Sequence, residues 1–199
     1  MRKLLLLTCI GVVLASCSPT TDSTGTTVTS PPPSTTTTRA PAPSTTTTVL
    51  PDFAVTSPAF RDGGAIPVEY TCDGTDTSPE LNIVGIPIST ASLVMIVADP
   101  DAPLGTWYHW VEFDIAGANS SLDLPAGTTT VGVPGVNSWH LEGYLGPCPP
   151  EGEEHQYVFG VYALGTTLDL PAGVDAVEVI AAMSDHVIST AELVGTYSR

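Results

Sequence analysis

The chain has 199 residues and a formal net charge of −16 at neutral pH, with 5 lysines and arginines against 21 acidic residues. From residue 52 onward the basic residues are Arg61 and Arg199, which excludes a nucleic-acid-binding surface, because such a surface requires a basic patch. The same balance argues against electrostatic adhesion to anionic lipids. The length accommodates one ordinary domain with accessory segments.

The first 16 residues are typical of a bacterial export signal. Arg2 and Lys3 precede an apolar run over residues 4–14, which ends in small residues and is too short to span a membrane comfortably. Residues 14–17 read Leu-Ala-Ser-Cys and resemble the lipobox of bacterial lipoproteins, in which the cysteine is diacylated through its sulfur. We therefore expect Cys17 to anchor an exported protein on the outer face of the cell membrane. The alternative is an ordinary signal peptide with an incidental cysteine.

Residues 17–51 are predicted to form a stalk that begins at the lipidated cysteine. Of the 33 residues from 18 to 50, 14 are Thr, 6 are Pro and 5 are Ser. Such a composition cannot bury enough apolar surface to offset the entropy of ordering it, which predicts a disordered segment. Extended in polyproline style at ~3.1 Å per residue, it would hold the predicted domain, residues 52–199, on the order of 100 Å from the membrane.

Two of the four cysteines remain for the domain. Cys9 leaves with the signal and Cys17 is the expected anchor, so Cys72 and Cys148 are left in an exported protein, where disulfides persist. We predict that these two cysteines pair. A pair of buried free thiols is the alternative.

The pattern from residue 53 onward predicts a mainly β domain, because short apolar or alternating runs are separated by turn residues. The run 93–98 is apolar at every position, as expected for a central strand buried on both faces. Residues 157–164 form a second strong run. One helix is expected, over residues 174–188, with an apolar stripe formed by Val177, Ile180, Ala181, Ser184 and Ile188. This pattern predicts an antiparallel β-sandwich with a few short peripheral helices.

Alternation places chemically active side chains at the strand ends. Asp99 follows the apolar face of the first strand, and His155 and Tyr157 begin the apolar face of the third. His109 begins the second strand, in which Trp107, His109, Val111, Phe113 and Ile115 are expected to share a face. If the first strand is antiparallel to the other two, Asp99, His109, His155 and Tyr157 gather at one end of the sheet.

A single histidine in this setting is more often structural, but two histidines, an aspartate and a tyrosine converging from separate segments favour a site. Protonated imidazole, the Tyr157 hydroxyl and backbone N–H groups suit a small anion or a phosphate headgroup. Asp99 would repel an anion unless it pairs with His109 or His155 and keeps that ring charged. Anion binding should therefore weaken as pH rises through histidine titration.

Several ordered motifs resemble those of the phosphatidylethanolamine-binding protein family. They are residues 70–74 (Tyr-Thr-Cys-Asp-Gly), 99–103 (Asp-Pro-Asp-Ala-Pro), 107–110 (Trp-Tyr-His-Trp), 146–150 (Gly-Pro-Cys-Pro-Pro) and 155–157 (His-Gln-Tyr). The resemblance covers residues 53–199 and implies a sandwich of two antiparallel sheets with a small anion pocket at one end. Carried onto this sequence, the implied pocket residues are Asp99, Trp107, His109, Pro149, His155 and Tyr157, supported by Asp101 and Gly146. The family often has an arginine where this chain has Gln156.

These observations lead to one expected function and one main alternative. We expect a non-enzymatic, membrane-anchored extracytoplasmic protein that binds a small anion or phospholipid headgroup, without a metal or cofactor. The alternative is a protein-interaction module that inhibits an extracytoplasmic hydrolase or protease. A hydrolase is less favoured because the pocket motifs contain no serine, and their one cysteine, Cys148, is predicted to be bridged. A metal site built from Asp99, Asp101 and His109 is likewise weakly supported.

Overall fold

The structure is a computed structural model that describes residues 51–117 and 119–199. The predicted signal peptide (1–16), the lipidated Cys17 and the stalk up to residue 50 lie outside the described residues. Among the helices of the described residues, none is long and apolar enough to cross a membrane.

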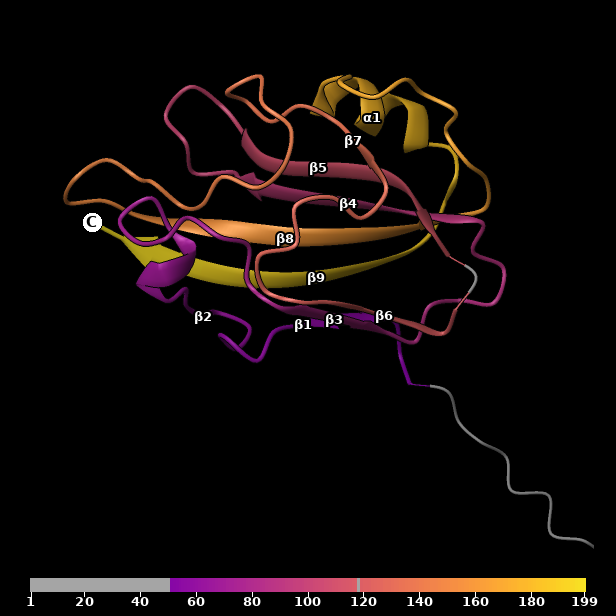
Figure 1. Cartoon of the computed structure of the whole chain (residues 1–199), viewed down its shortest axis with the longest axis horizontal. Helices are drawn as coiled ribbons and strands as arrows, with labels where there is room; N and C mark the ends of the chain where they lie inside the picture. Colours follow the sequence, from indigo (N-terminus) through magenta and orange to yellow (C-terminus); the bar gives the residue numbers. More distant parts are fainter. Residues whose placement is uncertain (1–50, 118) are drawn as a thin grey trace, which may run out of the picture. The chain divides into compact units, whose positions relative to one another are not determined.

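The described residues form two β-sheets with two short helices (Figure 1). The larger sheet has the order β2 (Gly64–Ala65), β9 (Val187–Ser198), β8 (Glu154–Leu164), β4 (Ser92–Asp99), β5 (Trp107–Ala116) and β7 (Val133–Pro134). The smaller has the order β1 (Ala54–Thr56), β3 (Leu81–Val84) and β6 (Ser121–Leu124). The helices are a 3-10 turn, η1 (Val68–Tyr70), and α1 (Ala176–Met183). The predicted sandwich is confirmed, although β2 pairs with β9 in parallel.

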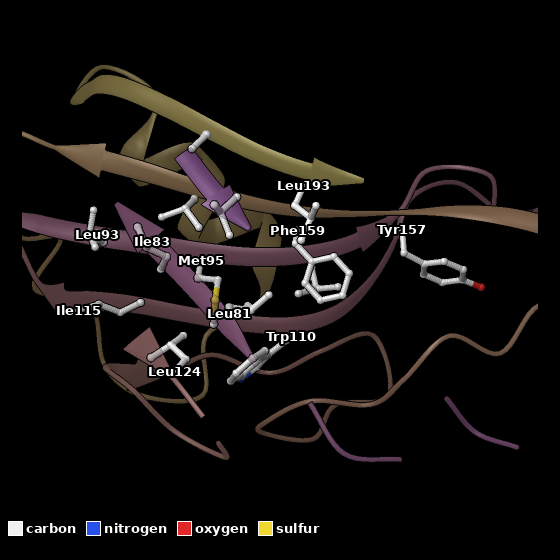
Figure 2. Close-up of a cluster of buried hydrophobic side chains, with 14 of the residues drawn as sticks. Leu81, Ile83, Leu93, Met95, Trp110, Ile115, Leu124, Tyr157, Phe159 and Leu193 are labelled. Atoms are coloured by element: carbon white, nitrogen blue, oxygen red, sulfur yellow. The ribbon is translucent and has the colours of Figure 1, made fainter. Parts of the chain in front are cut away.

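Strand β4 lies between β5 and β8 and is covered on both faces. Leu93, Met95 and Val97 belong to the core cluster that also contains residues of the smaller sheet (Figure 2), whereas Val94 and Ile96 belong to a second cluster with the buried side chains of α1. This double burial explains why residues 93–97 are all apolar, since alternation appears only where one face meets water. The predicted central strand is confirmed.

The predicted helix over residues 174–188 was too long, and its stripe was wrong. Helix α1 begins after Asp175, whose side chain accepts a hydrogen bond from the Glu178 N–H, and ends at Met183. Its buried residues are Ala176, Val179 and Met183, whereas Val177 is 64% exposed. The helix stops because the chain turns into β9, which pairs with β8 along its whole length.

Strand β5 changes face twice, and the simple alternation rule therefore failed for it. Its pairing with β4 shifts between β4 residues 97 and 98 and again between residues 93 and 95. At each shift β5 carries an extra residue, so its side chains move to the other face beyond that point. Val111 and Phe113 consequently face the α1 cluster, whereas Trp110 and Ile115 face the inter-sheet core.

The topology brings the ends of three strands together. Strand β4 is antiparallel to both β5 and β8, as expected, so its end at Asp99 lies beside the beginning of β5 at Trp107 and the beginning of β8 at Glu154. The chain enters the sandwich at the opposite end. Ala54, the first residue of β1, pairs with Val84 at the end of β3. Just after Val84, the Ile86 N–H donates a hydrogen bond to the Ser120 carbonyl, and Ser120 lies shortly after the end of β5 at Ala116.

Candidate anion-binding site

A cavity of about 320 Å³ opens at the end of the larger sheet where these strands meet. Five of the six predicted pocket residues line it, including Pro149, which follows the disulfide cysteine Cys148. The described lining consists of Asp99, Ala102, Pro103, Leu104, Trp107, His109, Trp139, Cys148, Pro149, Pro150, His155 and Arg199. The predicted convergence of Asp99, His109 and His155 is therefore present.

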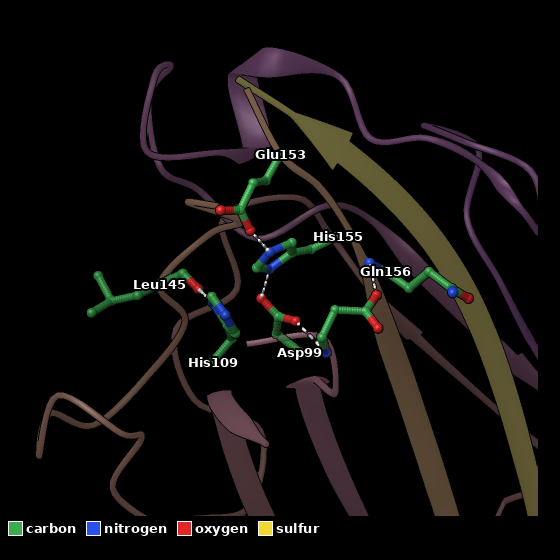
Figure 3. A network of polar contacts seen from close by, with 7 residues as sticks. Asp99, His109, Leu145, Glu153, His155 and Gln156 are labelled. Atoms are coloured by element: carbon green, nitrogen blue, oxygen red, sulfur yellow. Dashed lines mark hydrogen bonds and ion pairs between the residues drawn. The ribbon is translucent and has the colours of Figure 1, made fainter. Parts of the chain in front are cut away.

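His155 is held between two carboxylates (Figure 3). Its Nδ1 lies 2.8 Å from Asp99 Oδ2, and its Nε2 lies 3.2 Å from Glu153 Oε2. Asp99 is fixed in turn, because its Oδ1 accepts a hydrogen bond of 2.9 Å from the Asp101 N–H. Both ring nitrogens thus face acceptors, and the protonated imidazolium can donate to both.

The surroundings of His155 favour its cationic form. Burial alone would lower the pKa of His155, but hydrogen bonds to Asp99 and Glu153 and the charges of these carboxylates raise it above the ordinary histidine value. A raised pKa means that the positive charge persists to higher pH and is lost as pH rises through the new value. The pairing partner of Asp99 is therefore His155.

His109 has the opposite electrostatic character. Its Nδ1 lies 2.7 Å from the Leu145 carbonyl, which can only accept, so Nδ1 carries a proton and Nε2 is an acceptor in the neutral ring (Figure 3). Burial lowers the pKa of His109, outweighing the Leu145 hydrogen bond and the charge of Asp99. Two histidines in one cavity thus take different roles, and only His155 is set up as a cation.

Aromatic rings form one wall of the cavity. The rings of Trp107 and Trp139 meet edge to face with centroids 5.3 Å apart, and Trp139 meets His109 in the same way at 5.1 Å. The Trp107 indole N–H is buried and has no hydrogen-bond partner among the described residues. Since buried donors are normally paired, this N–H is a candidate contact for a bound group.

Tyr157 lies behind the cavity rather than on its surface. It is fully buried in the inter-sheet core (Figure 2), and its ring meets that of His109 at 5.3 Å. Its hydroxyl has no hydrogen-bond partner within residues 51–117 and 119–199. Burial and the negative charge of Asp99 raise the pKa of Tyr157, so the hydroxyl stays a neutral donor.

The two predicted supporting residues act on the backbone around the cavity. Asp101 binds Asp99 through its N–H, and its Oδ2 accepts a hydrogen bond of 2.8 Å from the Gln156 N–H, which joins the loop after β4 to β8. The Gly146 N–H donates to Asp76 Oδ1 over 2.6 Å. A Cβ at Gly146 would lie 2.3 Å from the Tyr70 carbonyl oxygen, so only glycine fits there.

The predicted disulfide between Cys72 and Cys148 is confirmed, with Cα atoms 5.5 Å apart. It joins residues separated by 76 positions in the sequence. A bridge over such a loop stabilises the fold by about 4 kcal/mol on the chain-entropy model. Since Cys148 also lines the cavity, the bridge fixes the wall that carries Pro149 and Pro150.

Comparisons with known proteins identify the family. The family described as "Phosphatidylethanolamine-binding protein" matches residues 56–198. The chain belongs to the phosphatidylethanolamine-binding protein (PEBP) family. It is 44% identical over 149 residues to a UPF0098 protein of Methanothermobacter thermautotrophicus, covering 71% of this chain and 95% of that protein. A UPF0098 protein of Chlamydia trachomatis is 39% identical over 150 residues, covering 73% and 98%.

Solved structures of PEBP relatives have the same fold. The crystal structure of the PEBP homologue CT736 from Chlamydia trachomatis is 38% identical, with a TM-score of 0.69, and covers 74% of this chain and 98% of its own. Escherichia coli YbcL, described as a member of the mammalian PEBP family, is 30% identical with a TM-score of 0.69, covering 75% and 99%. The resemblance inferred from the motifs is confirmed, and the chain is a binding-protein fold of this family.

The sequence reasoning missed Arg199 as a residue of this PEBP cavity. Arg199 follows β9, and its Nε lies 3.0 Å from Asp73 Oδ2, which also accepts a hydrogen bond of 2.8 Å from the Tyr197 hydroxyl. Asp73 thereby fixes a permanently charged guanidinium at the cavity wall. Ser198 pairs with Glu154 at the beginning of β8, so a correct prediction of the β8–β9 pairing would have placed Arg199 at the cavity end of the sheet.

Gln156, where the family often has an arginine, is exposed and lies outside the cavity lining, and its N–H donates a hydrogen bond to Asp101. Across the described ranges, no group of three or more His, Cys, Asp and Glu side chains is arranged to hold a metal ion.

Proposed function

We propose that this protein is an exported, lipid-anchored binding protein whose cavity holds a small anion, either phosphate or the phosphate of a headgroup, without chemical conversion. The observation that carries the proposal is the pair of cations in the cavity lining, imidazolium His155 and guanidinium Arg199. Both are held by buried or half-buried carboxylates, so each is oriented before a ligand arrives. Charge-assisted hydrogen bonds from such groups are about twice as strong as neutral ones.

The charge distribution supports directed binding. The domain carries two arginines among many acidic residues, and one of the two lines the cavity. An anion would therefore be held by a few aimed donors, while the acidic surface repels anions elsewhere. The buried Trp107 N–H supplies a neutral donor beside these cations. A volume of about 320 Å³ lies at the small end of ligand pockets, which suits a small group or a headgroup.

The lining also supports binding over catalysis. Covalent catalysis needs an activated nucleophile such as a serine or cysteine. Among the described residues that line the cavity there is no serine or threonine, and Cys148 is in the disulfide. His155 is committed to two carboxylates, which favours a constant positive charge over proton exchange during a reaction.

The Arg199→Gln variant is expected to bind inorganic phosphate about 10-fold more weakly than the wild type at pH 7, because one hydrogen bond from a charged donor contributes about 1.5–3 kcal/mol. Calorimetric titration of purified protein measures the dissociation constant. The matched control is Arg61→Gln, which removes the same charge from an exposed position outside the cavity lining and should bind within twofold of the wild type. Equal losses in both variants would mean that only the net charge matters.

The proposed membrane anchor is tested separately from the cavity. With Cys17→Ser, the protein is expected to lose label from radioactive palmitate and to move from the membrane fraction to the soluble fraction, because the acylated sulfur is absent. The wild type should carry the label. Retention of the variant in the membrane would contradict the anchor while leaving the anion proposal unaffected.

A second function is favoured by the apolar rim of the cavity. Leu104, which is 93% exposed, and Trp139, which is 39% exposed, are large hydrophobic side chains in the cavity lining. Exposed apolar groups around a concave site are typical of protein-binding surfaces. They favour the interaction-module alternative, in which the rim docks an extracytoplasmic hydrolase or protease. Purified protein should then inhibit proteolysis in envelope extracts, and Leu104→Ser should weaken that inhibition. No inhibition by the wild type would remove this alternative.

A further inference from the structure

Glu153 occupies the one donor of His155 that a ligand could reach. The Nδ1 of His155 is committed to Asp99, whose side chain is 6% exposed, so that bond is internal to the domain. Nε2 is the remaining donor, and Glu153 Oε2 lies 3.2 Å from it. A single N–H makes one strong hydrogen bond, so an anion that uses Nε2 must replace this carboxylate.

The two carboxylates on His155 differ in how firmly they are held. Asp99 is buried, approaches to 2.8 Å and has a second hydrogen bond from the Asp101 N–H. The Glu153 side chain is 57% exposed and approaches only to 3.2 Å, and among the described residues its carboxylate has no partner other than His155. Released from Nε2, the Glu153 carboxylate would be hydrated at once. Glu153 is therefore exchangeable, whereas Asp99 is not.

We propose that Glu153 is an internal competitor that an anion must displace from His155, and that this competition sets an affinity threshold for the site. The inference rests on the proposed function and deepens it by naming the residue that decides how strongly an anion must bind to occupy the site. A free carboxylate offers His155 the same chemistry as Glu153, but Glu153 is tethered two residues away and acts at an effective concentration on the order of millimolar. A free carboxylate at a lower concentration therefore leaves Glu153 in place.

A tetrahedral dianion gains from the same exchange. It carries more charge and more acceptor oxygens than a carboxylate, so it can accept from His155 and from Arg199 at the same time. Glu153 thus excludes weak anions by competition, and strong ones still bind with an affinity reduced by the fraction of molecules in which His155 is free. The reduction is the same for every anion that uses Nε2, so Glu153 decides which anions occupy the site at a given concentration and not their order of affinity.

The test compares Glu153→Gln with Glu154→Gln. Glu154 is the exposed neighbour of Glu153, its removal changes the net charge identically, and among the described residues its carboxylate makes no hydrogen bond to the His155 ring. Sulfate serves as a dianion of constant charge and acetate as the carboxylate. Calorimetric titrations are made at pH 5.5, below the ordinary histidine pKa of about 6.5, and Asp99 still faces His155 in the Glu153 variants. Glu153→Ala, which removes the acceptor entirely, is measured as a second variant.

The proposal predicts that Glu153→Gln and Glu153→Ala bind sulfate at least about fivefold more tightly than the wild type. The proportional gain for acetate should be similar to that for sulfate, because the same competitor is removed for both anions. Glu154→Gln should bind both within twofold of the wild type. Unchanged or weaker sulfate binding in the Glu153 variants, with a binding wild type, would overturn this inference alone. If neither the wild type nor any variant bound sulfate, the proposed function and the inference would both fail.

Discussion

Phosphate binding at pH 6 is expected to weaken about 10- to 100-fold when His155 is replaced by glutamine. The variant keeps a neutral donor that can reach Asp99, but it loses the cation that the two carboxylates maintain in the wild type. A hydrogen bond from a charged donor contributes about 1.5–3 kcal/mol, and each 1.4 kcal/mol is tenfold in affinity. Calorimetric titration with inorganic phosphate measures the change.

The control for His155→Gln is His186→Gln. His186 is exposed in the turn between α1 and β9, away from the cavity lining, so this variant should bind phosphate like the wild type. Loss of the imidazolium leaves Asp99 as a buried carboxylate without a cation, which destabilises the fold. Urea unfolding therefore checks that the variant is folded. In the double variant Asp99→Asn, His155→Gln, no buried carboxylate is left without a cation, so its binding can be measured without this destabilisation. Binding within threefold of the wild type in a folded variant would contradict the role of His155.

Replacement of Glu112 by alanine is expected to lower the free energy of unfolding by about 3 kcal/mol. Glu112 is fully buried on β5, and its carboxylate accepts three hydrogen bonds. The donors are the Trp110 indole N–H at 3.2 Å and the N–H groups of Val131 and Gly132 at 3.1 and 3.0 Å. Removing the carboxylate leaves these three donors without an acceptor, and each buried donor without a partner costs about 1–3 kcal/mol.

Urea unfolding without reductant measures this loss, so that the disulfide stays intact in both proteins. The control is Glu192→Ala, an exposed glutamate on β9, which should change stability by no more than about 0.5 kcal/mol. A loss of less than 1 kcal/mol in Glu112→Ala would mean that water or a rearranged loop satisfies the three donors. Since Glu112 lies outside the cavity lining, phosphate binding by the folded variant should be unchanged.

Local sequence pattern predicted the strands whose side chains alternate without interruption. In β8, Tyr157, Phe159 and Val161 all face the inter-sheet core, and the apolar run of β4 is buried on both sides. The pattern failed in β5, because two bulges depend on pairing with β4 and leave little trace in the sequence of β5 itself. The length of α1 was overestimated for a similar reason, since the pairing of β9 with β8 decides where the helix must stop.

Only those parts of the site that follow from the local sequence pattern could be predicted. Asp99, His109 and His155 follow from strand ends, but the choice of partner for Asp99 depends on three-dimensional distances. Arg199 and Trp139 reach the cavity from segments that no motif connects to it. No sequence motif indicates the role of Glu153 as a competitor, because that role depends on the contact between its carboxylate and Nε2 of His155.

Sulfate binding as a function of pH tests the central claim most directly, because the charge of sulfate is constant while that of His155 changes. The pKa of His155 is raised in the folded protein, so its positive charge is complete below the ordinary value of about 6.5 and is lost as pH rises through the folded value. Titrations of the wild type from pH 5.5 to pH 9 should therefore show affinity that is highest at acid pH and falls as pH rises through the raised pKa of His155. Affinity that stays constant over this range would contradict an anion site built on His155.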